Sequence, residues 1–218
     1  MKSISLITAA VCLASSAAFS QAIDKTKPNG RACLAIANIA NGDEEVLRPA
    51  NTAGKNQKIV AHLDATLGCE VLVAPFVKNG GLVTGWMPQY LNLDPGREAL
   101  APKAPALWSW EKDVGSLEIF VLFFAPGSKK GVEIRELLNA MRNAKSANIV
   151  KLQGSRLREL IASANFDKEA ARHAPKAITE VAGQMRMVVG FEWRDSARAV
   201  NFSAEKPGAL IFPFADAR

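Results

Sequence analysis

The 218-residue sequence contains few of the residues that most often form catalytic and metal sites: two histidines, three cysteines and one tyrosine. His62 and His173 lie at no spacing typical of metal ligands, which argues against a metal site. The sequence has no Gly-x-Ser-x-Gly elbow, and residues 127–130 lack the spacing of a phosphate-binding loop. We therefore expect a non-enzymatic protein with no catalytic residue, no cofactor and no bound metal.

Long apolar runs are also scarce, and the run near the start has the pattern of a signal peptide. In residues 1–22 the cation Lys2 precedes a short apolar run, Ile4–Ala18, which small residues close. This pattern predicts Sec-type export with cleavage near Ala22. A membrane anchor is the alternative, but the run is too short and too rich in alanine and serine to span about 30 Å of hydrocarbon. We expect a periplasmic or secreted chain with no transmembrane segment after cleavage.

The sequence has no large excess of one charge. Once Lys2 is removed, 26 basic residues stand against 21 acidic ones, a net charge of +5 with neutral histidines. Because bases and acids are interspersed, nucleic acid is not an expected partner. Cations in the segment expected to be helical could bind anionic lipid or a cell-wall polymer, although such faces are more often only solvated. They are Lys129, Lys130, Arg135, Arg142, Lys145, Lys151, Arg156 and Arg158.

Two cysteines, Cys33 and Cys69, remain after removal of the signal peptide. An even number of cysteines in an oxidising compartment favours a disulfide. Closing a loop of this length would stabilise the fold by roughly 4 kcal/mol in the chain-entropy model. The sequence therefore predicts a Cys33–Cys69 disulfide, with two buried free thiols as the alternative.

Several segments have the apolar pattern of β-strands. Cys69–Val77 and Leu117–Ala125 are dense in β-branched and aromatic residues, and Gln57–Leu67 alternates with a period of two. The Asn-Gly-Gly turn at 79–81 predicts a hairpin whose second arm is Leu82–Met87. Pro75 cannot donate a hydrogen bond to a ladder, so we expect it at a sheet edge or a bulge.

The spacing of apolar residues becomes helical after residue 128 and returns to the strand pattern near the end of the chain. Two apolar stripes at helical spacing predict helices over 129–141, with Ser128 as a cap, and over 148–164. A weaker third helix is expected over 167–183. The predicted strands outside this segment include Ala32–Ala40, Val46–Leu47, Ala106–Glu111, Met185–Trp193, Ala197–Ala204 and Ala209–Phe214.

Strands, then helices, then strands without βαβ alternation predict a mainly β (α+β) fold. The expected architecture is an antiparallel β-sandwich with an insertion of two to three helices at about 129–183. In this domain organisation, residues 1–22 are the signal peptide, residues 23–30 a flexible lead-in and residues 31–218 a single domain.

Four aromatic residues form the candidate binding surface: Trp86, Tyr90, Trp108 and Trp110. Aromatic side chains near polar loops can form a platform for carbohydrate or peptide. Filling of the core is the better-supported alternative, because large aromatics dominate buried area.

The stretch Cys69–Pro126 resembles a family of bacterial extracytoplasmic domains of unknown function. The order that carries the likeness is a strand, a Gly-containing turn, a second arm ending in Met87-Pro88, a polar loop, Gly115-Ser116-Leu117-Glu118 and an apolar strand. Family members end the second arm in Phe-Pro and have a turn shorter by one residue. The resemblance implies a β-sandwich and a cell-envelope setting, and it supplies no catalytic residue.

The function that these observations favour is an exported, non-enzymatic binding or assembly module of the bacterial envelope. The expected partner is an envelope protein, which would bind at a sheet edge near Pro75 or Pro213, or at the tryptophan-bearing loops. A hydrolase with an unrecognised site near His62 is the first alternative. Binding of anionic lipid or polymer through basic helices is the second.

Overall fold

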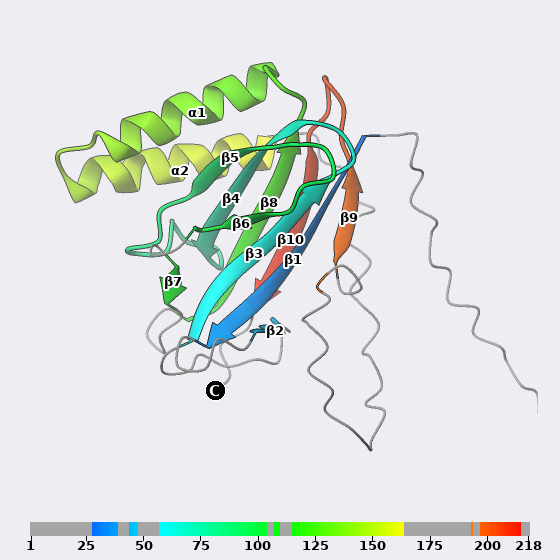
Figure 1. Cartoon of the computed structure of the whole chain (residues 1–218). Helices are drawn as coiled ribbons and strands as arrows, with labels where there is room; N and C mark the ends of the chain where they lie inside the picture. Colours follow the sequence, from blue (N-terminus) through cyan, green and yellow to red (C-terminus); the bar gives the residue numbers. More distant parts are fainter. Residues whose placement is uncertain are drawn as a thin grey trace, which may run out of the picture.

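The structure is a computed structural model that describes residues 28–38, 44–47, 57–103, 107–109, 115–163, 193 and 197–214. Within these residues the chain forms ten strands in two antiparallel sheets and two helices (Figure 1). The mainly β, α+β fold class predicted from the sequence is confirmed.

The first sheet is built on two long strands that pair along their whole length, β1 (Asn29–Asn38) and β3 (Gln57–Ala65). Four short strands pair with their outer edges: β2 and β9 with β1, and β6 and β7 with β3. These short strands are β2 (Glu44–Val46), β6 (Ala99–Ala101), β7 (Trp108–Ser109) and β9 (Arg198–Asn201). We call this the six-stranded sheet.

The second sheet has four strands in the order β10-β8-β4-β5. Its strands are β4 (Cys69–Val77), β5 (Gln89–Leu93), β8 (Leu117–Phe124) and β10 (Gly208–Phe214). The central strands β4 and β8 are the two dense apolar runs of the sequence, and their alternate side chains enter two different hydrophobic clusters. They are therefore covered on both faces, as a continuous apolar run requires.

The first hydrophobic cluster contains side chains of both sheets. Leu34 and Leu63 of the six-stranded sheet are in the same cluster as Val71 and Phe123 of the four-stranded sheet. Close packing here requires a glycine in β1, because a Cβ at Gly30 would lie 2.1 Å from Cδ1 of Phe123. The period of two in β3 thus reports a strand with one face in this cluster.

The second cluster lies between the four-stranded sheet and two helices, α1 (Lys129–Arg142) and α2 (Ala147–Ser163). The helices lie side by side along one face of this sheet (Figure 1). Ser128 caps α1 as predicted, since its Oγ accepts a hydrogen bond from the Gly131 N–H at 3.2 Å. In the part of the chain that the structure describes, no helix is both long and apolar enough to cross a membrane.

Arg158 of α2 attaches the helix pair to the turn that follows β4. Its guanidinium donates to the Val77 carbonyl at 3.0 Å and also to the Gly80 carbonyl. A third hydrogen bond, at 2.7 Å, runs to Oε2 of Glu118 in β8. Asn79 has a φ of 57°, a backbone conformation that asparagine tolerates better than most residues.

The predicted hairpin is wrong in its second arm. The turn exists, but Leu82 makes only an isolated bridge with Phe76, and the neighbour of β4 in the sheet is β5. The sequence analysis predicted no strand over the residues of β5 and β6. The first strand also begins at Asn29, inside the predicted lead-in. The predicted third helix, over 167–183, lies outside the described residues.

The predicted Cys33–Cys69 disulfide is also wrong, because both cysteines are free and buried. Cys33 alternates with Ala32 and Leu34, whose side chains are in the first cluster, so it faces the opposite side of the six-stranded sheet. Cys69 belongs to the first cluster itself. The two thiols are therefore on different sheets and on opposite sides of the strand β1. Burial raises the pKa of each thiol to about 12.

Candidate functional site

The outer edge of β5 has backbone groups that no described residue pairs with. The Pro75 carbonyl accepts a hydrogen bond from the Val83 N–H, and the Val77 N–H donates to the Gly81 carbonyl. The backbone groups of these odd-numbered residues therefore point toward the side of β4 on which β5 lies. Backbone groups of successive strand residues point to alternate sides. It follows from the register that Gln89, Leu91 and Leu93 bond to β4.

Tyr90 and Asn92 therefore direct their N–H and C=O groups away from the sheet. No hydrogen bond joins these backbone groups to any residue within the described ranges. We call the four backbone groups of Tyr90 and Asn92 the open edge.

The opposite edge of the same sheet, on β10, is protected. The Ile211 carbonyl accepts a hydrogen bond of 2.6 Å from the Arg198 guanidinium. The same guanidinium lies 4.9 Å from the ring centroid of Phe212. Pro213 has the same outward direction as Ile211 and has no N–H to offer. Proline and a covering cation are two of the devices that keep an edge strand from pairing with another chain.

Within the described residues, the open edge has neither a proline nor a cation bonded to its outward carbonyl groups. The sequence of β5 is Gln-Tyr-Leu-Asn-Leu, with no charged residue and no proline. The strand pairs with β4 through all five residues. Short strands of two to four residues form the edges of the six-stranded sheet. Within the described residues, β5 is thus the edge at which an added strand meets the fewest obstacles.

A groove of about 310 Å³ runs between β5 and one side of α1. Tyr90 and Asn92 line it from β5, together with Leu91. The lining residues of α1 are Arg135, Leu138, Asn139 and Arg142. They fall at positions i, i+3, i+4 and i+7, which places them on one helix face. The open edge and this face of α1 therefore border the same groove.

Glu70 of β4 holds the two sides of the groove together. Its side chain is 8% exposed, and Oε1 lies 3.1 Å from the Arg135 guanidinium. The Tyr90 hydroxyl donates a 3.0 Å hydrogen bond to Oε2. Burial, followed by this hydrogen bond, raises the pKa of Tyr90. The carboxylate has two strong partners, so it acts as a fixed structural group.

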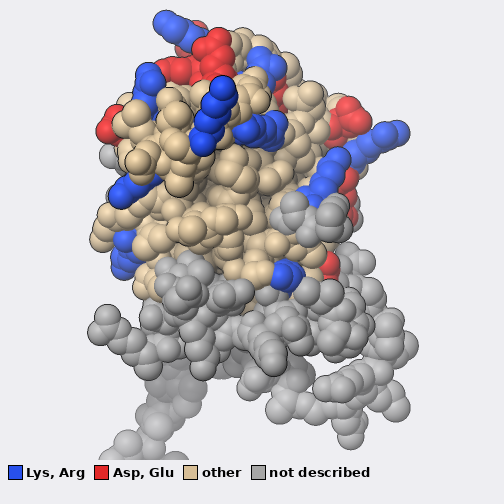
Figure 2. Space-filling model, turned by 90° about the vertical axis from the view of Figure 1, so that its left-hand side faces the viewer, with Lys and Arg blue, Asp and Glu red and all other residues tan. Residues whose placement is uncertain are grey.

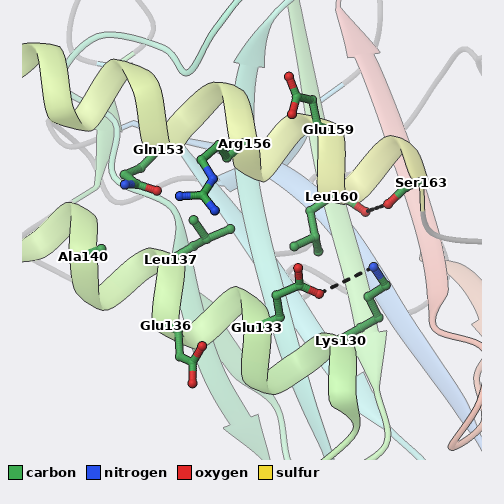
Figure 3. Close-up of a pocket in the computed structure, with 10 residues that line it drawn as sticks. All are labelled: Lys130, Glu133, Glu136, Leu137, Ala140, Gln153, Arg156, Glu159, Leu160 and Ser163. Atoms are coloured by element: carbon green, nitrogen blue, oxygen red, sulfur yellow. Dashed lines mark hydrogen bonds and ion pairs between the residues drawn. The ribbon is translucent and has the colours of Figure 1, made fainter.

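A second groove, of about 480 Å³, separates α1 from α2 (Figure 3). Leu137 and Leu160 project into the space between the two helices, where Arg156, Glu133 and Lys130 also lie. Lys130 and Glu133 form an ion pair of 3.5 Å. The charged lining residues are Lys130, Glu133, Glu136, Arg156 and Glu159, so acids outnumber bases. The groove therefore gives no support to binding of an anionic polymer.

One face of the molecule shows the same mixture of charges. In Figure 2, lysine and arginine side chains are most frequent in the upper part and along the edges of the view, and acidic side chains lie among them at the top and at the right. The described surface in this view is largely free of charge between them. A basic patch of the kind that binds polyanions would show adjacent cations without acids.

His62 lies on the side of the six-stranded sheet that faces away from the first cluster. Its Nδ1 is 2.8 Å from Oε1 of Glu98, and its Nε2 is 2.9 Å from Oε2 of Glu44. The ring also stacks on Trp193, with 5.6 Å between centroids. A carboxylate oxygen thus lies within hydrogen-bond distance of each ring nitrogen.

Each ring nitrogen of His62 faces a carboxylate oxygen in this structure. A general base needs a ring nitrogen with a free lone pair near its substrate. Cys33 is the pairing neighbour of His62, but its thiol has a pKa of about 12 because it is buried. Its Sγ lies 3.5 Å from the Leu34 carbonyl. The cysteine is therefore not an activated nucleophile.

The predicted aromatic surface is divided between the core and the groove. Trp86 and Trp108 are 6% and 3% exposed, and their rings stack with 5.4 Å between centroids. The Trp86 indole N–H donates to the Ser109 carbonyl at 3.0 Å, so its polar atom is also satisfied. Tyr90 lines the groove beside the open edge, and Trp110 lies outside the described residues.

The sequence analysis missed β5 as a functional element. A usable signal was present: Gln89–Leu93 has no charge and no proline, and it lies between Pro88 and Asp94-Pro95-Gly96. Such a segment can be a strand whose edge is unprotected. Its position next to α1 could not be read from the sequence, because it depends on the pairing of β5 with β4.

Comparison with known proteins gives no relative from which a function could be transferred: no family model, no curated protein and no solved structure matches this chain.

Proposed function

We propose that this protein is a non-enzymatic binding or assembly module that adds an extended segment of a partner protein to the open edge of β5. The observation that carries the proposal is the contrast between the two edges of the four-stranded sheet. Arg198 and Pro213 protect β10, whereas β5 has unpaired backbone groups and no charge. A strand added to an exposed edge gains main-chain hydrogen bonds at every second residue.

The strength of such binding follows from the number of free groups. Tyr90 and Asn92 offer two donors and two acceptors, and each hydrogen bond contributes about 1 kcal/mol net. Four such bonds alone give weak binding once the cost of association is subtracted. Side-chain contacts in the groove must therefore supply the rest, and the partner must present a segment that is already extended.

Export to the bacterial envelope is a second part of the proposal. The N-terminal pattern of Lys2 and the apolar run Ile4–Ala18 supports it, as does the resemblance of Cys69–Pro126 to extracytoplasmic domains. Fractionation of expressing cells tests it directly. Recovery of a C-terminally tagged, shortened chain in the periplasmic fraction or the medium is the expected result. Full-length protein confined to the cytoplasm would contradict it.

Replacement of Asn92 by proline tests strand addition. The Asn92 N–H points away from β4, so Asn92→Pro removes one donor of the open edge and leaves the β4 ladder intact. Asn92→Thr is the matched control, because it changes the same side chain and keeps the N–H. Both variants should show the same cooperative unfolding as the unchanged protein, within about 1 kcal/mol.

The readout is capture of envelope proteins by the tagged full-length chain at low and at moderate salt. We expect one protein to be retained at both salt concentrations by the unchanged chain and by Asn92→Thr, and to be lost from Asn92→Pro. Retention by Asn92→Pro would refute strand addition at β5. Loss of all partners at moderate salt would instead indicate binding by charge alone, since salt screens exposed charges.

A further inference from the structure

The side-chain groups that line the groove between β5 and α1 have one sign of charge. Arg135 and Arg142 line it, and no acidic residue does. Behind the lining, the Glu70 carboxylate is held by Arg135 and by the Tyr90 hydroxyl. This carboxylate compensates the charge of Arg135, so the remaining charge of the groove is that of Arg142.

Arg142 has no acidic partner within the described part of the chain. It stands in the last turn of α1, where a cation offsets the partial negative charge of the helix end. That role requires only its charge and leaves the N–H groups of the guanidinium available. Asn139 precedes it by three positions on the same helix face and lines the same groove.

We infer that the segment that pairs with β5 carries an acidic side chain facing α1, and that Arg142 and Asn139 bind its carboxylate. The inference rests on the proposed strand addition and names the chemistry of the partner segment. A guanidinium can hold a carboxylate by two parallel hydrogen bonds, and the Asn139 amide can donate a third.

The geometry of an added strand explains why only the side chains on one face of the partner would contact α1. Side chains of a strand alternate between the two faces of the sheet and recur on one face about every 6.8 Å. Tyr90 packs on the second cluster, beneath the helices, and Asn92 shares its face of β5, so every second residue of an added strand faces α1 as well. The expected partner is an extended peptide with an acidic residue at one of the alternate positions that face α1.

Three synthetic octapeptides test the inference. Each has the sequence (Thr-Xaa)4 with blocked ends, and Xaa is glutamate, glutamine or lysine. They are titrated into the isotope-labelled full-length chain, and amide shifts of β5 and α1 are followed by NMR up to about 2 mM peptide. We expect the glutamate peptide to bind about three- to fivefold more tightly than the glutamine peptide at low salt, and the lysine peptide to bind most weakly.

Arg142→Gln is the variant that removes the charge of the groove. We expect it to abolish the preference for glutamate and to leave the binding of the glutamine peptide unchanged. Arg156→Gln is the matched control, because it removes another exposed charge, from the groove between α1 and α2. It should leave the preference unchanged.

The possible results separate this inference from the proposed function. Binding of all three peptides with equal affinity, lost in Asn92→Pro, would overturn the acidic preference and leave strand addition standing. A glutamate preference that persists in Arg142→Gln would overturn the assignment to Arg142. Binding of the glutamate peptide that Asn92→Pro leaves unchanged would show attraction by charge alone and overturn both. Absence of binding by all three peptides would also overturn both.

Discussion

Two buried free thiols make the free energy of unfolding of this protein fall as the pH rises through the alkaline range. Burial raises the pKa of Cys33 and of Cys69 from 9.0 to about 12. Between these values the unfolded chain has lost the thiol protons while the folded chain retains them. The unfolded state therefore binds fewer protons, and the free energy of unfolding falls as the pH rises.

The magnitude follows from the number of thiols. Each contributes its full stabilisation below about pH 9 and loses about 1.4 kcal/mol per pH unit in the window up to about pH 12. Together Cys33 and Cys69 give a slope of about 2.7 kcal/mol per pH unit. Tyr90, whose pKa is also raised, adds a slope of its own at higher pH.

Urea unfolding at a series of pH values from about 8 to 11 measures this slope. The variant with Cys33→Ala and Cys69→Ala should be less stable at neutral pH, because it loses buried volume, but its slope should be shallower by about 2.7 kcal/mol per pH unit. Equal slopes for the two proteins would refute the reasoning. If the unfolded chain contained no thiol that reacts with a thiol reagent, Cys33 and Cys69 would be oxidised, and the reasoning would also fail.

Three further substitutions test the packing described above by urea unfolding. Gly30→Ala places a methyl group against the Phe123 ring and should cost about 1–3 kcal/mol, and an unchanged midpoint would contradict the close contact. Ser128→Ala removes the cap of α1 and should lower the free energy of unfolding by about 1 kcal/mol. Ser128→Thr keeps a capping hydroxyl, so an equal loss of stability in that variant would argue against capping. Arg158→Gln leaves Glu118 without its cation and should cost about 2 kcal/mol; full stability would show that α2 does not depend on this attachment.

The elements with strong local signals were predictable from the sequence. The apolar density of Cys69–Val77 and the alternation in Gln57–Leu67 correspond to β4 and β3. The helical period and the Ser128 cap correspond to α1. In β3 and α1 one face is buried in a single cluster, so the side-chain period survives in the sequence, whereas β4 is buried on both faces and is recognised as a continuous apolar run.

The errors concern long-range pairing. Leu82–Met87 has the composition of a strand, yet β4 pairs with Gln89–Leu93 instead, because tertiary contacts decide between two weak candidates. The disulfide prediction failed since the direction of Cys33 depends on the register of β1 with β3. A shift of one residue would turn that side chain to the other face.

The groove was beyond sequence analysis for the same reason. Arg142 and Asn92 are separated by 50 positions in the chain, and only the packing of α1 on the four-stranded sheet brings them to one groove. The sequence analysis also proposed a sheet edge as the binding surface, but near Pro75 or Pro213 and not at β5. Proline marks positions where no donor is available, so it identifies protected edges better than open ones.

Amide hydrogen exchange of the five residues of β5 tests the central claim most directly. The account predicts slow exchange for the amides of Leu91 and Leu93, which bond to β4, by at least about 100-fold relative to an unstructured peptide. The amides of Tyr90 and Asn92, which point away from β4, should exchange within about tenfold of the unstructured rate. Equal, strong protection of all four amides in the free protein would contradict the open edge and, with it, strand addition at β5.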